Sequence, residues 1–335
     1  MPSPKFTALP HPKASDKRSL NNKNGSDSEV FAGAYLIMAT GGEISWGSRE
    51  EDGNKIDLLL SFPNQWGIRG RKIVLAQVKS GPSYGKVDTK NGVIKAELLK
   101  KIFEDSFTET NDILLLWIER KKNRCFWTYV NRGDKPAKRP LAATQLISPA
   151  LRYDLARIIG SREKHGGQGL IFSTEETDFR SKRTTAQRFY REYASQMIIS
   201  PLLGQIKVTK SGWRHMSRAS RRSGFKQSSY EIMQWLPQII ERAPDYHETQ
   251  SSNIYPTDVW TYRDSIYMLV YQKVKRHALP KPELTTVYIK IEESIVYPTN
   301  WHQTVQRLQL VERHCKLLSV YYHLGQQKRG KHVAS

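Results

Sequence analysis

One stretch of sequence is central to how the N-terminal half of this chain folds: Ile73-Val74-Leu75-Ala76-Gln77-Val78-Lys79-Ser80-Gly81. Its first four residues are apolar, which predicts a buried strand over 72–79. Side chains alternate between the two faces of a strand, so Gln77 and Lys79 are expected on the same face. The sequence therefore predicts a strand that presents two polar groups near its end.

A second polar position precedes the previous strand. The segment Asp52-Gly53-Asn54-Lys55-Ile56-Asp57 leads into an apolar run, which predicts a strand over 56–61. If this strand neighbours the strand over 72–79, Asp57, Gln77 and Lys79 converge at one edge of the sheet. Glu29, on a helix expected earlier in the chain, could reach the same place.

Apolar spacing predicts the order α-β-β-β-α-β, with one further strand, for the first domain. A helix is expected from Asp27 or Ser28 over Glu29–Ala39, and Gly41-Gly42 ends it. The other expected elements are strands at about 43–48, 56–61 and 72–79, a helix at 93–104, and strands at 112–119 and 125–130.

Asp57, Gln77, Lys79 and Glu29 suit the hydrolysis of phosphodiester bonds. Carboxylate and carbonyl oxygens from Asp57, Gln77 and Glu29 can hold Mg²⁺ or Mn²⁺, which lowers the pKa of a bound water. A lysine such as Lys79 can steady the attacking water or the developing negative charge. The alternative is a surface aspartate beside a lysine whose stem covers the sheet edge.

The D-G-x-x-I-D segment at 52–57 and the Q-x-K-S segment at 77–80 resemble one branch of the PD-(D/E)xK nuclease superfamily. The resemblance covers about residues 26–135 and implies a restriction-endonuclease-like α/β fold. It implies that Asp57 and Gln77 are metal ligands, Lys79 the catalytic lysine and Glu29 an acidic partner. Gln77 departs from the commoner pattern, which has a carboxylate there.

Composition points to a polyanionic partner. The 335 residues include 53 Lys and Arg against 32 Asp and Glu, a net charge of +21. This excess argues against an enzyme for small neutral substrates. The two cysteines are too few for a disulfide framework or a cysteine-based zinc site. The apolar runs are too short to cross a membrane, and a soluble, cytoplasmic protein is expected.

The sequence predicts two domains, an N-terminal tail and one connecting region. Residues 1–26 are expected to be a disordered basic tail, 27–135 the nuclease-like domain, 136–180 a connecting region, and 181–335 a basic α+β domain with an antiparallel sheet. Helices are expected at about 149–159, 183–198, 211–222, 229–242 (with a split or restart at Pro237) and 305–322, and strands at 205–209, 266–274 and 287–292.

The C-terminal half carries a dense basic segment. From Arg180 to Lys226 there are twelve Lys and Arg residues against the single acid Glu192. A helix over 211–222 would place His215, Arg218 and Arg222 on one face. A histidine among arginines suits metal-independent RNA cleavage, with the imidazole as general acid or base. The alternative is a basic face that binds nucleic acid without chemistry.

Residues of about 183–300 weakly resemble the barnase–EndoU–colicin–RelE-like nucleases. The resemblance rests on the Gly204–Lys207 strand, the G-W-x-H-x-x-R run at 212–218 and the antiparallel strands that follow. It implies active-site roles for His215 and Arg218, and for Arg221.

These observations lead to one functional hypothesis and two rivals. We expect a metal-dependent nuclease that hydrolyses phosphodiester bonds in nucleic acid, with DNA rather than RNA as the expected substrate, and that acts, by analogy, in anti-phage defence or a mobile element. The rivals are a metal-independent RNase centred on His215 and a non-catalytic nucleic-acid-binding protein. A homo-oligomer or a partner in a defence complex is a further expectation. The expected nucleic-acid contacts are Arg214, Arg221, Arg222, Lys207, Lys210, Lys121 and Lys122, and Tyr267, Tyr271, Tyr321 and Tyr322 either stack on bases or pack in the core.

Overall fold

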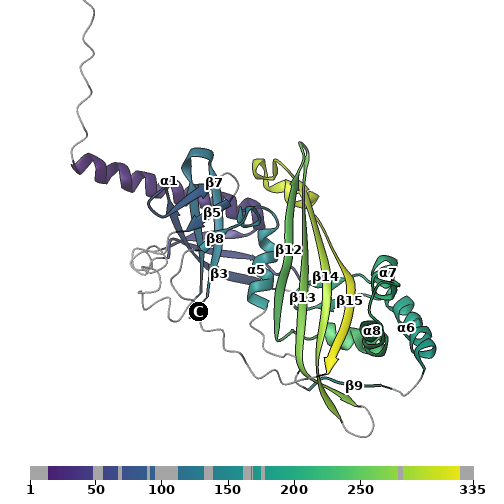
Figure 1. Ribbon diagram of the computed structural model, residues 1–335. Helices are drawn as coiled ribbons and strands as arrows, with labels where there is room; N and C mark the ends of the chain where they lie inside the picture. The colour runs from purple at the N-terminus through teal and green to yellow at the C-terminus, as the bar shows by residue number, and fades with distance from the viewer. Residues whose placement is uncertain are drawn as a thin grey trace, which may run out of the picture. The chain divides into compact units, whose positions relative to one another are not determined.

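The computed structural model separates the chain into two compact units. The residues that it describes are 14–47, 56–66, 70–88, 91–94, 112–131, 139–160, 167, 169–174, 178–277 and 282–324. The first unit consists of Met1–Ser61 and Ile73–Ile147, and the second of Phe62–Lys72 and Ser148–Ser335. Figure 1 shows their elements. No helix in the described ranges is long and apolar enough to span a membrane.

A five-stranded mixed sheet forms the centre of the first unit. Its order is β1-β2-β3-β6-β7. The strands are β1 (Glu43–Trp46), β2 (Leu58–Pro63), β3 (Arg71–Ser80), β6 (Ile113–Glu119) and β7 (Arg124–Val130). β3 and β6 are parallel, whereas β1–β2 and β6–β7 are antiparallel. All five strands expected from the apolar runs are confirmed, and β3 is the central one.

The first helix, α1 (Ala14–Thr40), is longer than the sequence pattern indicates. Its apolar face, with Ala32, Leu36 and Ala39 fully buried, lies in the segment where a helix is expected. The N-terminal part, from Ala14 onward, is polar all round, so apolar spacing gives no signal for it. The expected disorder is therefore wrong for residues 14–26, and residues 1–13 lie outside the described part.

A small antiparallel sheet replaces the start of the helix expected at 93–104. Its order is β4-β5-β8, from β4 (Gly85–Asp88), β5 (Asn91–Ile94) and β8 (Arg139–Leu141). Val93 and Ile94 are thus strand residues, and the remaining positions of the expected helix fall outside the described residues. β4 lies tightly against β6, because a Cβ on Gly85 would come within 2.6 Å of the Trp117 ring.

The segment expected to connect the two domains, 136–180, contains several ordered elements in its described part. It holds β8, the short helix η2 (Ala143–Gln145), α5 (Leu151–Gly160) and β9 (Ile171–Ser173). α5 confirms the helix expected at 149–159. The division between the units falls at Ile147/Ser148, and α5 is joined to strands of the second unit by Asp154 and Arg157.

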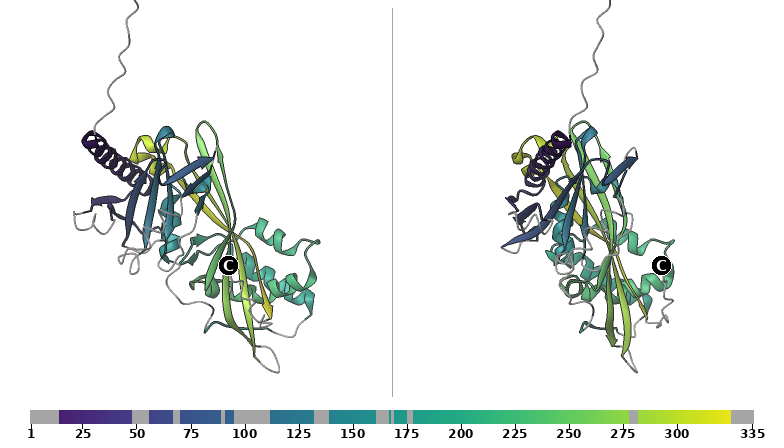
Figure 2. Two further views of the ribbon diagram at one scale, coloured as in Figure 1. Left: turned by 60° about the vertical axis from the view of Figure 1, so that its left-hand side comes forward. Right: turned by 90° about the vertical axis from the view of Figure 1, so that its left-hand side faces the viewer.

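Long antiparallel strands and helices on one of their faces form the second unit (Figures 1 and 2). The sheet order is β12-β13-β14-β15, and β9 pairs in parallel with β13. The strands are β12 (Tyr246–Pro256), β13 (Trp260–His277), β14 (Glu283–Pro298) and β15 (Glu312–Leu324). Val287, Ile289 and Ile291 are fully buried, as their alternation predicts. The expected α+β organisation with an antiparallel sheet is confirmed.

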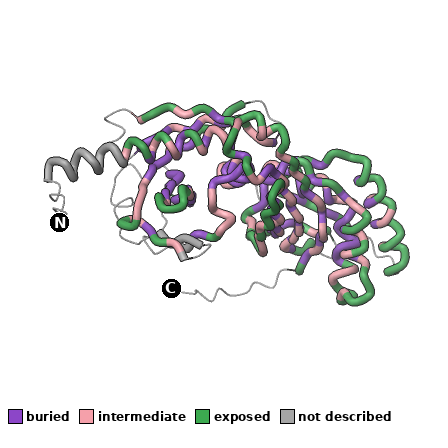
Figure 3. Tube along the Cα trace, turned by 90° about the horizontal axis from the view of Figure 1, so that it is seen from above, coloured by how far each residue is buried: buried purple, intermediate pink, exposed green. Residues whose placement is uncertain are grey.

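Helices α6 (Phe179–Tyr193), α7 (Lys210–Ser217), α8 (Ser223–Ile232) and α9 (Leu236–Ile240) cover the buried face of this sheet. Figure 3 shows buried residues inside the second unit and exposed residues on its outer turns. Pro237 lies in the first turn of α9, so the expected restart at this proline is confirmed. The short strand β11 (Gly204–Ile206) matches the first part of the strand expected at 205–209.

The helix expected at 211–222 is interrupted. α7 ends at Ser217, and Arg218 has an extended backbone with φ −56° and ψ 146°. Arg222 is also extended, at φ −55° and ψ 141°, and precedes α8. Arg218 and Arg222 therefore do not share a helix face with His215, which corrects the expectation.

The helix expected at 305–322 is wrong: η5 (Val305–Leu310) is followed by the strand β15. A bulge explains the error. Lys290 pairs with Ser319 and Ile291 with Leu317, so Leu318 is an extra residue in the ladder. Cys315 and Leu317 are buried before the bulge, and Val320 and Tyr322 after it. This change of parity puts Cys315 and Tyr322, which are seven residues apart, on the same face of the strand, and a spacing of seven also fits one face of a helix.

The free edge of β15 is covered by neighbouring segments. Lys207 donates its backbone N–H to Cys315 O at 2.8 Å and accepts from Leu317 N at 2.9 Å. Ser229 Oγ on α8 donates to Val320 O. α7 approaches so closely that a Cβ on Gly212 would lie 2.2 Å from Leu317 O. These contacts protect an edge that could otherwise pair with another chain.

Buried ions join α5 to the strands of the second unit. Asp154 accepts from Arg263 Nη1 at 2.5 Å and from Arg157 Nη2 at 2.5 Å. Glu293 accepts from Arg313 Nε at 2.7 Å and from the Tyr267 hydroxyl at 3.1 Å. Burial alone would raise the pKa of Glu293, but the Arg157, Arg313 and Arg263 guanidinium groups outweigh it and lower the pKa to about 2.

This arrangement makes the stability of the protein sensitive to acid. The folded-state pKa of Glu293 is below its ordinary value, so its stabilisation is complete above about pH 4.5 and is lost as the pH falls towards 2. We expect Glu293→Gln to lower the free energy of unfolding at pH 7 by about 3–5 kcal/mol. Urea denaturation between pH 7 and pH 3 measures both effects.

The matched control is Glu292→Gln on the opposite face of β14. Glu292 pairs with Lys316 at 3.0 Å and is partly exposed, so its replacement is expected to cost less than about 1 kcal/mol. If the parent and Glu293→Gln lose stability in parallel below pH 4.5, the carboxylate of Glu293 is not the acid-sensitive group.

Candidate functional site

Two backbone hydrogen bonds fix Asp57, one to Gly47 directly after β1 and one to Ala76 on β3. Its N–H donates to Ala76 O at 3.0 Å, and its carbonyl accepts from Gly47 N at 3.0 Å. The side chain is buried, and Oδ2 accepts from Val78 N at 2.5 Å. The carboxylate is therefore held against the end of β3 where the sequence places Gln77 and Lys79.

Lys79 and Gln77 complete this group on β3. The Lys79 ammonium lies 3.6 Å from Asp57 Oδ2, with a quarter of its side chain exposed. Gln77 is fully buried, and neither its amide oxygen nor its amide nitrogen has a hydrogen-bond partner among the described residues. The expected approach of Asp57 to Lys79 is confirmed. A buried amide without a partner costs stability, so it needs a reason to be there.

The other predicted residues of this group lie around it. Glu29 is on α1 and is partly buried, and its role stays a prediction. Lys121 and Lys122 are exposed in the short helix η1 (Arg120–Lys122) between β6 and β7. Arg120 donates to Ser80 Oγ at 2.6 Å, which holds this basic turn beside the end of β3. Residues 52–55 of the D-G-x-x-I-D segment are outside the described ranges.

The donor atoms fit a hard divalent cation. Asp57 supplies carboxylate oxygens, and Gln77 supplies an amide oxygen without a described partner. Mg²⁺ prefers oxygen donors and keeps several waters, so two protein donors are compatible with it. Within the described ranges, no group of three His, Cys, Asp or Glu residues is placed to hold a metal ion. Any site here therefore depends on the neutral Gln77 and on water.

His215 is the centre of the second group. It is partly buried on α7, and its Nδ1 atom has no hydrogen-bond partner among the described residues. Burial and the charges of Arg218, Arg221 and Lys290 hold the pKa of His215 below its ordinary value. The imidazole is therefore neutral at pH 7 and can accept a proton, as a general base must.

The basic residues of the C-terminal half separate into different places. Lys210 and Arg214 line a cleft between α6 and α7. Lys207 lines another cleft, with Trp66 and Arg313. Arg222 lines a third, beside Phe225 and His323. Basic residues that are close together in the sequence are thus spread over several surfaces of the second unit.

Arg221 has a different position from the other arginines. It donates to Met216 O at 3.2 Å, and its guanidinium lies over the rings of Phe225 and Tyr321. Sequence reasoning overlooked Lys290 and Tyr288, which are on the partly exposed face of β14. The alternation of β14 could have identified both, since Val287 and Ile289 occupy the buried face.

The tyrosines expected to stack or pack fall into two classes. Tyr267, Tyr271 and Tyr322 are buried, which confirms core packing for these three. Tyr321 is partly exposed, on the other face of the sheet.

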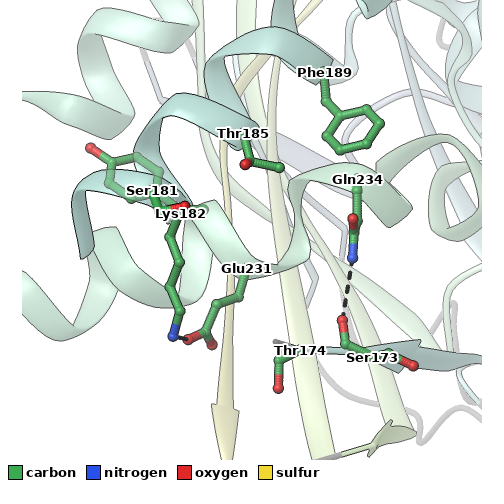
Figure 4. Close-up of a pocket in the computed structure, with 9 residues that line it drawn as sticks. Ser173, Thr174, Ser181, Lys182, Thr185, Phe189, Glu231 and Gln234 are labelled. Atoms are coloured by element: carbon green, nitrogen blue, oxygen red, sulfur yellow. Dashed lines mark hydrogen bonds and ion pairs between the residues drawn. The ribbon is translucent and has the colours of Figure 1, made fainter. Parts of the chain in front are cut away.

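A small cavity beside α6 and α8 is lined by polar groups that pair with one another (Figure 4). Lys182 Nζ lies 2.6 Å from Glu231 Oε1, and Gln234 Nε2 donates to Ser173 O at 3.3 Å. Burial would raise the pKa of Glu231, but hydrogen bonds from Lys182, Tyr322 and Gln227 hold it below its ordinary value. The polar groups that line this cavity pair with one another, so no ligand is needed to account for them.

Comparison with known proteins gives no relative from which a function could be transferred. No family model matches the chain, and neither a curated protein nor a solved structure matches it. The assignment of both groups of residues therefore depends on their own geometry and chemistry.

Proposed function

We propose that the first unit is a metal-dependent nuclease that hydrolyses phosphodiester bonds. The observation that carries this proposal is the fully buried Gln77, whose amide has no described partner beside the Asp57–Lys79 contact. The carboxylate and the amide oxygen can ligate a metal ion, and the ammonium can donate hydrogen bonds to a phosphate or to the attacking water, which are roles that metal-assisted hydrolysis uses. A purely structural role would leave the Gln77 amide unexplained.

The arrangement of the sheet supports a restriction-endonuclease-like fold. One helix and two strands, β1 and β2, precede the parallel β3–β6 pair. A parallel pair requires a crossover connection, which is compatible with the α-β-β-β-α-β order of the PD-(D/E)xK superfamily. The proposed site lies where β3 ends, next to its neighbour β2.

The residues act as follows in this proposal. Asp57 and Gln77 would hold Mg²⁺ or Mn²⁺, with Glu29 as an acidic partner, and a cation held there would supply polarisation of the scissile phosphate and activation of a water. Lys79 donates hydrogen bonds to the attacking water or to phosphate oxygens, where negative charge develops as the P–O bond breaks. Lys121 and Lys122 contact the phosphate backbone from the adjacent turn.

The substrate proposed for the first unit is DNA in preference to RNA. The net charge of +21 supports a nucleic-acid partner, since a basic surface gains affinity by releasing counterions from phosphates. A cytoplasmic role in anti-phage defence or a mobile element, with a second copy or a defence complex as partner, follows by analogy with the superfamily.

Lys79→Ala tests this proposal directly. We expect the rate of DNA cleavage with Mg²⁺ to fall by about 100-fold or more, because an aligned donor to the reacting phosphate is lost. Lys72→Ala, on the same strand, is the matched control and keeps the parental rate. Cleavage of labelled DNA and RNA with Mg²⁺, Mn²⁺ or EDTA is the measurement. A parental rate in Lys79→Ala would contradict catalysis and leave a nucleic-acid-binding module.

Gln77→Glu tests the proposed metal donor in the opposite direction. A carboxylate adds a negative charge to the site, so we expect the Mg²⁺ concentration for half-maximal cleavage to fall about tenfold. A titration of cleavage rate against Mg²⁺ measures this. An unchanged midpoint in a variant with parental thermal stability would show that Gln77 does not contact the cation.

We infer a second candidate activity, metal-independent RNA cleavage at His215. The partial exposure of this histidine, and its lowered pKa beside Arg218 and Arg221, support it. The neutral imidazole would take the proton of a ribose 2′-hydroxyl, whose oxygen attacks the adjacent phosphorus and displaces the 5′-oxygen. Arg218 and Arg221 would stabilise the negative charge on the phosphate.

RNA cleavage in EDTA tests this second activity. We expect cleavage that His215→Ala abolishes and that the control His314→Ala retains. Because the pKa of His215 is lowered, the rate should stay high down to a pH below 6.5. Lys290→Gln removes a nearby positive charge, so the acid limb should move to higher pH. Complete inhibition of RNA cleavage by EDTA would refute the activity.

A further inference from the structure

Two tyrosines stack on each other on the face of the second unit's sheet opposite its apolar core. Tyr288 on β14 and Tyr321 on β15 are direct cross-strand partners. Their ring centroids are 5.2 Å apart, and their planes differ by 14°. Both are partly exposed, in contrast to the buried Val287 and Ile289 on the other face.

Two further rings extend this pair into an aromatic platform, defined here as Tyr288, Tyr321, His323 and Phe225. Phe225 meets Tyr321 edge-on at 5.2 Å and 89°. His323 contacts Tyr288 and Tyr321 at 5.5 and 5.4 Å and is itself exposed. These contacts fix the orientation of the platform before any ligand binds.

Positive charge borders the platform. The Arg221 guanidinium lies 5.8 Å from the Tyr321 ring centroid, and Lys290 is the next residue along the same face of β14. Both charges act on His215. In the part of the chain that the structure describes, no ion pair includes Arg221 or Lys290. Nearby acids on this face have other partners: Glu292 pairs with Lys316, and Asp264 accepts from Ser294.

We propose that the aromatic platform binds the bases of single-stranded RNA. Unpaired bases stack on aromatic rings, and phosphates are attracted to the flanking cations, so rings with adjacent positive charge suit an unpaired strand. In a duplex the faces of the bases are covered by neighbouring base pairs, so the bases cannot stack on the rings of the platform. The choice of RNA rests on the proposed activity of His215, which lies near Arg221 and Lys290 at the border of the platform.

The test uses the full chain with a His215→Gln background in EDTA. Glutamine still accepts a hydrogen bond but cannot act as the proton acceptor, so the RNA stays intact and the metal-dependent activity is silent. The probe is a fluorescein-labelled 12-nucleotide oligouridylate, and fluorescence anisotropy measures its Kd. We expect Tyr288→Leu/Tyr321→Leu to raise this Kd by about tenfold or more, because two stacking surfaces are lost.

Two matched variants separate stacking from general damage. Tyr288→Phe/Tyr321→Phe keeps both rings and should retain the Kd of the background protein. Tyr255→Leu/Tyr262→Leu changes another exposed cross-strand tyrosine pair of the same sheet, and its Kd should also be unchanged. A Kd unchanged in Tyr288→Leu/Tyr321→Leu, or raised equally in the Tyr255/Tyr262 variant, would overturn the platform.

Further probes decide the class of nucleic acid. A 12-nucleotide oligodeoxyuridylate should bind about threefold or more weakly, since it lacks the 2′-hydroxyl. Tighter or equal binding of this DNA would overturn the choice of RNA. A 12-base-pair RNA duplex should be insensitive to loss of the two rings, and a matching loss of duplex affinity would contradict base stacking. Cleavage of the probe in the His215→Gln background would refute the role of His215, whereas the tyrosine comparison tests the platform separately.

Discussion

A buried ionic network joins α5 to three strands of the second unit. Asp154 and Arg157 on α5 are joined to Arg263 on β13, Glu293 on β14 and Arg313 on β15, and all five side chains are at most one-tenth exposed. Three guanidinium groups face two carboxylates, so the network keeps one excess positive charge. Arg157 lies over the Tyr267 ring at 4.2 Å, and Arg313 over the Trp66 ring at 4.7 Å. These aromatic faces offset part of that charge.

The network explains why the strands of the second unit have a single register. Each ion must meet its partners without water, and a slip of one residue would move Glu293 to the opposite face of the sheet. The same register places Tyr288 opposite Tyr321 and brings Lys290 towards His215. The proposed binding surface is thus a consequence of how the buried ions are paired on the other face.

Much of the first unit could be predicted from sequence because its strands are short apolar runs bounded by turns. The approach of Lys79 to Asp57 follows once the two strands are neighbours. The C-terminal half was harder to predict, because the bulge at Leu318 imitates helical spacing. His215, Arg218 and Arg222 matched a helix face in the sequence, but the backbone becomes extended at Arg218 and separates them. Local spacing cannot reveal a bulge or a break that long-range pairing imposes.

The sequence by itself determined the basic character of the chain, the strands that carry Asp57, Gln77 and Lys79, and the inward face of β14. These properties depend on charge and on periods of two residues, which are local. Only the tertiary structure decided that the Gln77 amide is buried without a described partner, and that Tyr288 stacks on Tyr321 beside Arg221. Both results depend on segments far apart in the chain, whose approach is set by strand pairing and packing rather than by neighbouring residues.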